Sequence, residues 1–151
     1  AFTSSLKRAQ QTLDAILETL NLIIPVTSHA SLNERHYGIH TGKNKWEIKK
    51  LVGDEEFMKI RRGWDYPIPG GESLKDVHAR VIPYYQTEIH QHIVAGNNVL
   101  LVAHGNTIRA LVKHLENIPD DKIAAVEVAT GEVLLYQLDH RGKVLKKESR
   151  R

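Results

Sequence analysis

The sequence predicts an α/β fold in which a mostly parallel sheet is flanked by helices in three layers. The aliphatic run Val99–Val102 has the length and branched side chains typical of a strand buried on both faces. A short polar turn and a helical pattern follow it at once, with apolar residues recurring on one face at Ile108, Leu111, Val112 and Leu115. This strand-turn-helix order is the unit from which parallel sheets are built.

The bulk composition indicates a single domain over residues 1–151. The chain is 41% hydrophobic and 26% charged, contains no cysteine, and shows no linker or internal repeat. Its formal net charge of +3 suits a small anionic ligand. The basic residues are spread along the chain, and those of the carboxyl end, Lys146, Lys147, Arg150 and Arg151, are expected to be frayed and solvated, so no nucleic-acid partner is expected. No apolar run reaches the roughly 18 residues of a membrane span, and the lack of cysteine is compatible with a cytoplasmic location.

Before the central strand, the periodicity predicts four helices and one short strand. Hydroxyl residues at 3–5 are expected to cap a helix that continues to Leu20, and Ile24–Thr27 to form a strand. Two short helices are expected at Lys45–Leu51 and Asp54–Ile60, with Trp46, Ile48, Leu51, Phe57 and Ile60 facing inward. Ser73 is expected to cap a long helix that reaches Ile93 and is kinked at Pro83.

After the helix that follows His104, the pattern turns to strands. Val126–Ala129 and Val133–Leu138 are expected to pair about a turn at Thr130-Gly131, and a last strand is expected at Val144-Leu145.

His104, Gly105 and Asn106 end the central strand and begin a helix. In open α/β sheets this edge binds ligands, because free amide N–H groups and the helix dipole favour an anion there. His104 is therefore a candidate phosphate or carboxylate ligand. The alternative is a hydrogen-bonded histidine that closes a turn, and the local pattern does not decide between them.

Other candidate residues come from loops and helix ends. Glu34 is one carboxylate among Arg35, His36, Lys43 and Lys45, and beside a polyanion it could donate and accept a proton. Arg8 opposes the dipole of its helix, so it is either solvated or paired with an anion. Arg61 and Arg62 precede a rigid Pro/Gly connection that could hold them over a site. Each of these features also fits an ordinary polar surface.

Several motifs in a fixed order resemble one family. They are Thr3-Ser-x-Leu-x-Arg-Ala-x-Gln-Thr-Leu, Leu32-Asn-Glu-Arg-His-Tyr-Gly, Thr41-Gly-x-Asn-Lys, Arg61-Arg62, Gly71-Glu-Ser-Leu, Ala103-His-Gly-Asn and Thr130-Gly. Together they resemble the cofactor-dependent (2,3-bisphosphoglycerate-dependent) phosphoglycerate mutases of the histidine phosphatase superfamily. The resemblance covers nearly the whole chain.

The resemblance implies an enzyme that interconverts 2- and 3-phosphoglycerate through a phosphohistidine, primed by 2,3-bisphosphoglycerate and without a metal. Arg8 and His104 would flank the transferring phosphoryl group, and Glu34 would be the general acid/base. Substrate carboxylate and phosphate would be held by Tyr37, Lys45, Arg61, Arg62, Gly105 and Asn106. The resemblance further implies glycolysis and gluconeogenesis in the cytoplasm, and it allows a homo-oligomer without fixing its size.

One departure from the family is large. The family's nucleophile lies in an Arg-His-Gly motif after the first strand, and this sequence contains no Arg-His-Gly. Because the chain also begins with Ala1, we expect an N-terminally truncated domain that lacks the family's first strand, folds poorly and is inactive alone.

Two other functions remain open. A phosphatase or bisphosphoglycerate mutase of the same superfamily is one, because the connection between Arg62 and Gly70 is shorter than in many members. A nucleophile-free anion-binding or interaction module is the other.

Overall fold

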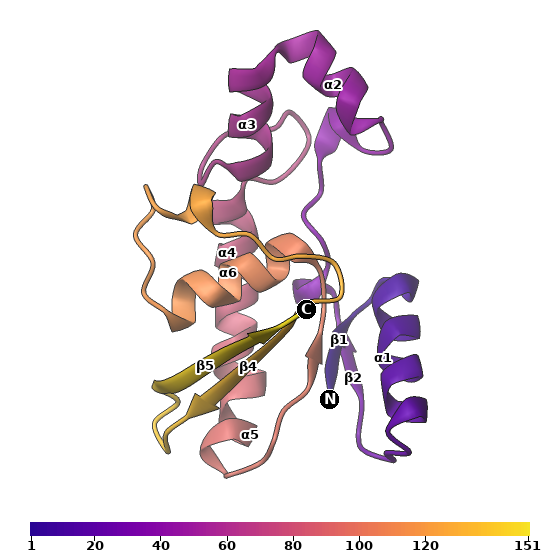
Figure 1. Ribbon diagram of the computed structural model, residues 1–151, viewed down its shortest axis with the longest axis vertical. Coiled ribbons are helices and arrows are strands. Elements are labelled where there is room, and N and C mark those ends of the chain that lie inside the picture. The colour runs from indigo at the N-terminus through magenta and orange to yellow at the C-terminus, as the bar shows by residue number, and fades with distance from the viewer.

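The computed structural model describes residues 1–151 and has three layers around a small parallel sheet (Figure 1). The sheet contains β1 (Phe2–Ser4), β2 (Thr27–His29) and β3 (Leu101–Val102) in the order β2-β1-β3, with both pairings parallel. Helix α1 (Lys7–Thr19) contacts β1 and β3 on one face. On the other face α5 (His90–Val94) lies over β1, with the rings of Phe2 and His92 5.5 Å apart. The expected α/β architecture is confirmed.

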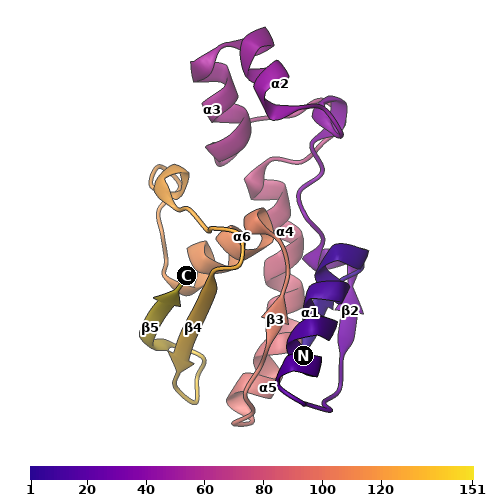
Figure 2. The ribbon, with the colours of Figure 1, turned by 45° about the vertical axis from the view of Figure 1, so that its right-hand side comes forward.

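The opposite layer is built from α4 (Leu74–Tyr84), the π-helical turn η3 (Tyr85–Ile89) and α6 (Gly105–Leu115). Helices α4 and α6 pack together, as Figure 2 shows from the side, and both contribute to the main hydrophobic core. The buried core residues are Phe2, Leu32, Leu74, Val77, Val81, Ile82, Tyr85, Ile89, Ala110, Leu111 and Ile123. Ser73 caps α4 as expected, in a reciprocal capping box with Asp76. The irregularity expected at Pro83 takes the form of η3, whose wider turn begins two residues after the proline.

Helices α2 (Lys45–Val52) and α3 (Asp54–Arg62) project from the body as a pair (Figure 1). They enclose a second core of Ile48, Phe57, Ile60 and Ile68. The expectation that Trp46 and Leu51 face inward is wrong, because they are 58% and 79% exposed. The pair of helices α2 and α3 packs against other residues on one side only, so these two side chains have no neighbours to bury them.

A narrow neck joins this helical pair to the body. The amide of Ile39 donates to the carbonyl of Pro69 at 3.1 Å, and the amide of Glu72 donates to the carbonyl of His36 at 2.8 Å. The two chain segments cross at Gly38 and Gly71. A Cβ on Gly38, where φ is +52°, would stand 2.1 Å from the Pro69 oxygen, so no other residue fits the crossing.

The first strand was not expected. Residues 3–5 were expected to cap α1, but β1 occupies Phe2–Ser4, and Leu6 stands at the cap position without a side-chain cap. Three residues show no strand periodicity in the sequence, and their conformation depends on partners 25 and 99 positions away. The second strand lies three residues beyond the start of the predicted segment Ile24–Thr27.

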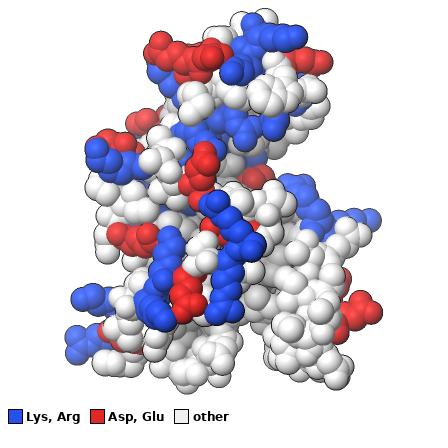
Figure 3. All heavy atoms as spheres, in the orientation of Figure 1, with Lys and Arg blue, Asp and Glu red and all other residues white.

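The carboxyl-terminal expectations are wrong in two respects. Val126–Ala129 is not a strand, and β4 (Val133–Leu138) instead pairs antiparallel with β5 (Val144–Arg150). The carbonyl of Val126 accepts from the Arg109 guanidinium at 3.0 Å, which removes that group from strand pairing. The basic tail, which was expected to be frayed, is ordered as β5 up to Arg150, although Lys146, Arg150 and Arg151 are solvent-exposed as expected. Lys147 pairs with Glu116, the residue after α6, at 2.6 Å. Figure 3 shows basic side chains over this hairpin interleaved with acidic ones.

Three short 3-10 turns complete the structure: η1 (Ala30–Leu32), η2 (Gly38–His40) and η4 (Ile123–Ala125). None of the helices combines the length and apolar character needed to cross a bilayer.

Replacing Ser73 by alanine tests the capping box. We expect Ser73→Ala to lower the free energy of unfolding by about 1 kcal/mol, because the amide of Asp76 loses its acceptor at the start of α4. Urea denaturation measures the change. Ser28→Ala, at an exposed hydroxyl without a hydrogen bond, is the control and should change stability little. Equal effects of the two substitutions would contradict a special contribution from the cap.

Candidate functional site

The carboxyl ends of β1 and β3 bring Ser4 and His104 together, although 100 residues separate them. Their side chains are hydrogen-bonded, with 2.7 Å between Ser4 Oγ and His104 Nε2. Because both strands run in the same direction, their ends meet at one edge of the sheet. The first turn of α1 carries Arg8 to the same edge, and α6 begins there at Gly105.

His104 is 92% buried and occupies the N-cap position of α6. Burial lowers the pKa of its imidazole, and the positive charges of Arg8 and Arg80 lower it further, while the negative charge of Glu34 opposes them. The ring is therefore neutral at neutral pH, and it can act as a hydrogen-bond donor without carrying charge.

Glu34 lies against the amino end of α6. Its Oε1 accepts from the amide of Arg35 at 2.7 Å and from the amide of Asn106 at 3.3 Å. Its Oε2 faces Gly105, where an added Cβ would be 3.9 Å from that oxygen. A carboxylate at this position is stabilised by the positive end of the helix dipole. The structure thus places an acid/base group next to a buried neutral histidine.

Asn106 connects α6 to the loop that carries Glu34. Its Nδ2 donates to the hydroxyl of Tyr37 at 3.1 Å, and its Oδ1 accepts from Arg109 at 3.1 Å. The Arg109 guanidinium also donates to the carbonyls of Ile123 at 2.9 Å and Arg62 at 3.2 Å. Burial lowers the pKa of Arg109 to about 10, with further lowering by Arg62 and Arg35. It still carries its charge at neutral pH.

A cavity of about 630 Å³ opens beside Glu34. Of the nine residues predicted for the site, Arg8, Glu34, Tyr37, Lys45 and Arg61 line it. Arg8, Lys43, Lys45 and Arg61 make no ion pair with a protein carboxylate, so their charges are free to meet an anion. The cavity is therefore strongly cationic, and of the two carboxylates on its wall Glu34 lies next to α6 and Glu72 is paired with Arg80.

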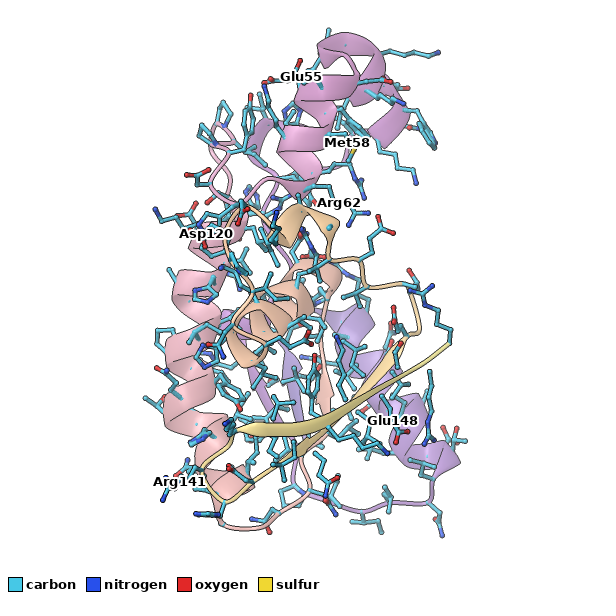
Figure 4. The ribbon with its side chains drawn as sticks, turned by 60° about the vertical axis from the view of Figure 1, so that its left-hand side comes forward. Glu55, Met58, Arg62, Asp120, Arg141 and Glu148 are labelled. Atoms are coloured by element: carbon cyan, nitrogen blue, oxygen red, sulfur yellow. The ribbon has the colours of Figure 1, made fainter.

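The other four predicted residues lie outside the cavity lining. His104, Gly105 and Asn106 stand behind Glu34 and Tyr37 through the contacts described above. The Arg62 side chain is turned away and forms an ion pair with Glu127, as its position at the end of α3 in Figure 4 illustrates. Arg62 therefore contributes its backbone carbonyl, which accepts a hydrogen bond from Arg109, rather than its guanidinium.

Sequence reasoning missed a partly buried ion pair in the cavity wall. Arg80 of α4 donates to both carboxylate oxygens of Glu72, at 2.7 and 2.9 Å, and also to the carbonyl of Glu34 at 3.3 Å. Burial raises the pKa of Glu72, but hydrogen bonds from Arg80 and the amide of His36 outweigh it, so the net shift is downward. A helical arginine eight residues after a glutamate carries no sequence signal for such a contact.

Arg35 was noted only as a neighbour of Glu34, yet it is 97% buried. Its guanidinium lies 4.4 Å from the centre of the Tyr37 ring and donates to the carbonyl of Ile60 at 2.7 Å. It thus fixes Tyr37 and joins the loop to α3. No group of three or more histidine, cysteine, aspartate or glutamate side chains has the geometry of a metal site.

Comparison with known proteins gives the context for this geometry. A phosphoglycerate mutase of Nitrobacter winogradskyi, named 2,3-bisphosphoglycerate-dependent, is 47% identical over 97% of this chain and 72% of its own length. A phosphoglycerate mutase of Schizosaccharomyces pombe is 45% identical over 98% of this chain and 71% of its own length.

Among solved structures, Bacillus stearothermophilus YhfR superposes with a TM-score of 0.79 at 26% identity, over 95% of this chain and 69% of the other. A mycobacterial glucosyl-3-phosphoglycerate phosphatase in complex with VO3 gives a TM-score of 0.75 at 25% identity, over 98% of this chain and 73% of the other. The family model for branch 1 of the histidine phosphatase superfamily matches residues 1–150. The chain therefore belongs to the histidine phosphatase superfamily, branch 1.

Proposed function

We propose that the protein interconverts 2- and 3-phosphoglycerate by phosphoryl transfer, with 2,3-bisphosphoglycerate as the priming phosphoryl donor. The observation that carries the proposal is the position of Glu34, which stands between a buried neutral histidine and a cavity of unpaired cations. The names of the relatives point to the same substrate and cofactor.

The proposed roles follow from the position of each group. Arg8 and His104 flank the transferring phosphoryl group, and Glu34 exchanges a proton with the substrate hydroxyl. Tyr37, Lys45, Arg61 and Asn106 hold the substrate carboxylate and phosphate, and the amide of Gly105 supplies a donor at the start of α6. Phosphoryl transfer depends mainly on positioning and on charge neutralisation, which a cationic cavity provides. For Arg62 the proposal requires its side chain to exchange Glu127 for the substrate.

The proposed two-step transfer also needs a histidine that receives the phosphoryl group. His104 is not suited to this role, because its Nε2 is bonded to Ser4. The phosphohistidine is therefore proposed for a protein that also carries an Arg-His-Gly segment, a motif that these 151 residues do not contain.

A phosphatase is the second candidate, and a specific observation favours it. The mycobacterial glucosyl-3-phosphoglycerate phosphatase, which acts on a phosphoglycerate ester by its name, has a similar fold. In such an enzyme water, rather than a second glycerate hydroxyl, would receive the phosphoryl group. For either reaction we propose small phosphate esters as partners. For the mutase we propose a cytoplasmic place in glycolysis and gluconeogenesis.

An assay of the 151-residue chain with 3-phosphoglycerate and 2,3-bisphosphoglycerate tests the need for the additional histidine. We expect neither 2-phosphoglycerate nor inorganic phosphate to form above the uncatalysed rate, because no covalent acceptor is present. The same chain with an Arg-His-Gly segment supplied should isomerise phosphoglycerate. Efficient isomerisation by the 151 residues alone would contradict the proposed two-step route, and phosphate release without isomerisation would favour the phosphatase.

Removal of one cavity cation tests the substrate site. Arg61→Ala should weaken binding of 3-phosphoglycerate about 10- to 100-fold, since a hydrogen bond to a charged group contributes about 1.5–3 kcal/mol. Isothermal titration calorimetry measures the dissociation constant. Arg141→Ala changes the net charge equally at an exposed turn away from the cavity, and it should leave binding nearly unchanged. Equal weakening by both variants would show a net-charge effect rather than a site.

The electrostatic coupling of Arg8 to His104 is measurable without a ligand. Arg8→Gln should raise the pKa of His104, because a positive charge that disfavours the imidazolium is removed. An NMR titration of the His104 ring follows the shift, and Lys7→Gln, one residue away and exposed, is the control. An unchanged pKa in Arg8→Gln would contradict the proximity of the two groups.

A further inference from the structure

Ser4 has no place in the roles proposed above, yet it is fully buried at the edge where the site forms. Its backbone is held by the parallel pairing of β1 with His29 of β2. Its carbonyl accepts from Gln10 Nε2 at 3.2 Å. On the opposite edge of β1, where it pairs with β3, the hydroxyl of Thr3 donates to the carbonyl of Val102 at 2.8 Å, two residues before His104. The position of Ser4 relative to His104 is therefore fixed by the sheet.

The hydrogen bonds of the Ser4 hydroxyl define where its proton lies. The oxygen has two neighbours within hydrogen-bond distance, the amide of Leu6 at 3.2 Å and Nε2 of His104 at 2.7 Å. The Leu6 amide can only donate, so it uses a lone pair of the hydroxyl oxygen. His104 Nε2 is then the one acceptor available to the hydroxyl hydrogen.

The opposite arrangement leaves a buried donor without a partner. If Nε2 carried the hydrogen and donated to Ser4, the hydroxyl oxygen would accept twice and its own hydrogen would have no acceptor. Buried polar groups in folded proteins are satisfied in nearly all cases, because an unmade hydrogen bond is costly away from water. The geometry therefore favours a hydroxyl that donates to an unprotonated Nε2.

We propose that Ser4 is a positioning residue that holds neutral His104 in the Nδ1–H tautomer. A free histidine side chain prefers the Nε2–H tautomer, so the protein must impose this one. The His104 ring makes no hydrogen bond within the protein other than the one to Ser4. Nδ1–H is thus an unused donor, on a ring whose pKa is affected by the charges of Arg8 and Glu34.

The use of this donor rests on the proposed function, in which a phosphoryl group lies beside His104. A neutral ring with its hydrogen on Nδ1 can donate to a phosphoryl oxygen throughout the transfer, whereas the other tautomer would present a lone pair to an anion and repel it. The low pKa of His104 keeps the ring neutral, and Ser4 decides which nitrogen donates.

The tautomer is read directly by long-range 1H–15N correlation NMR of the histidine rings at neutral pH, without substrate or turnover. His104→Asn identifies the His104 signals. In the unmodified chain we expect an unprotonated shift for Nε2 and a protonated shift for Nδ1. Ser4→Ala should shift the population towards Nε2–H, and Ser4→Thr, which keeps the hydroxyl, should restore the original tautomer.

Ser5→Ala is the matched control, because Ser5 is adjacent and exposed and its hydroxyl has no hydrogen bond. A protonated Nε2 in the unmodified chain would overturn the proposal, as would a Ser4→Ala spectrum identical to that of Ser5→Ala. If Ser4→Ala fails to fold, the spectrum of the unmodified chain still decides the tautomer.

The kinetic consequence is measured separately, in the chain supplied with an Arg-His-Gly segment. Ser4→Ala should lower kcat about 10- to 100-fold with little change in KM, the range seen when the outer partner of a functional imidazole is removed. Absence of mutase activity in all variants, together with the expected spectra, would reject the proposed function and leave the tautomer assignment intact.

Discussion

The parallel pairing of β1 with β3 is the constraint on which the rest of the structure depends. It is short, joining Phe2 to Leu101 and Thr3 to Val102, but it sets two strand ends at the same edge. Every further contact of the site starts from that edge: the Ser4–His104 hydrogen bond, the start of α6 and the approach of Glu34. A shift of this register by one residue would turn Ser4 away from His104, because alternate side chains of a strand face opposite sides.

Two buried arginines hold the loops around this edge without any carboxylate partner. Arg35 and Arg109 donate mainly to backbone carbonyls, and Arg109 also to the amide oxygen of Asn106. A buried charge of this kind is costly unless its donors are satisfied; all three nitrogens of the Arg109 guanidinium donate hydrogen bonds, whereas Nε of Arg35 has no partner. Because no protein anion neutralises them, their charges add to those of the cavity cations. Arg35 lines the cavity and Arg109 lies behind it, so the positive potential of the cavity comes both from lining arginines and from one placed more deeply.

Elements with long regular patterns could be predicted from the sequence, whereas elements that depend on residues far away in the chain could not. Helices α2, α3, α4 and α6 follow from apolar periodicity, and the Ser73 cap follows from its position before that periodicity. The prediction missed β1, which is only three residues long, and it wrongly placed a strand at Val126–Ala129, where Arg109 binds the carbonyl of Val126. Both errors come from contacts between residues that are far apart in the sequence.

For the site, family motifs named residues that the structure brings together, including Glu34, His104 and Asn106. Motifs did not reveal the buried groups that position them. The sequence predicts a helix cap at residues 3–5, which include Ser4, and gives no reason to single out Arg80 or Arg109. Their importance lies in burial and in bonds to backbone carbonyls, properties that appear only once the fold exists.

The neck at Gly38 and Gly71 has a consequence for how such an enzyme can diversify. Residues between the two crossing points form an excursion with its own small core, and its entry and exit are fixed by two backbone hydrogen bonds. Insertions or deletions within the excursion that keep the Arg35–Ile60 and Arg109–Arg62 hydrogen bonds can therefore occur without moving Glu34 or His104. Lys45 and Arg61 lie on the excursion whereas Glu34 lies outside it, so one part of the cavity wall can vary in sequence separately from the other.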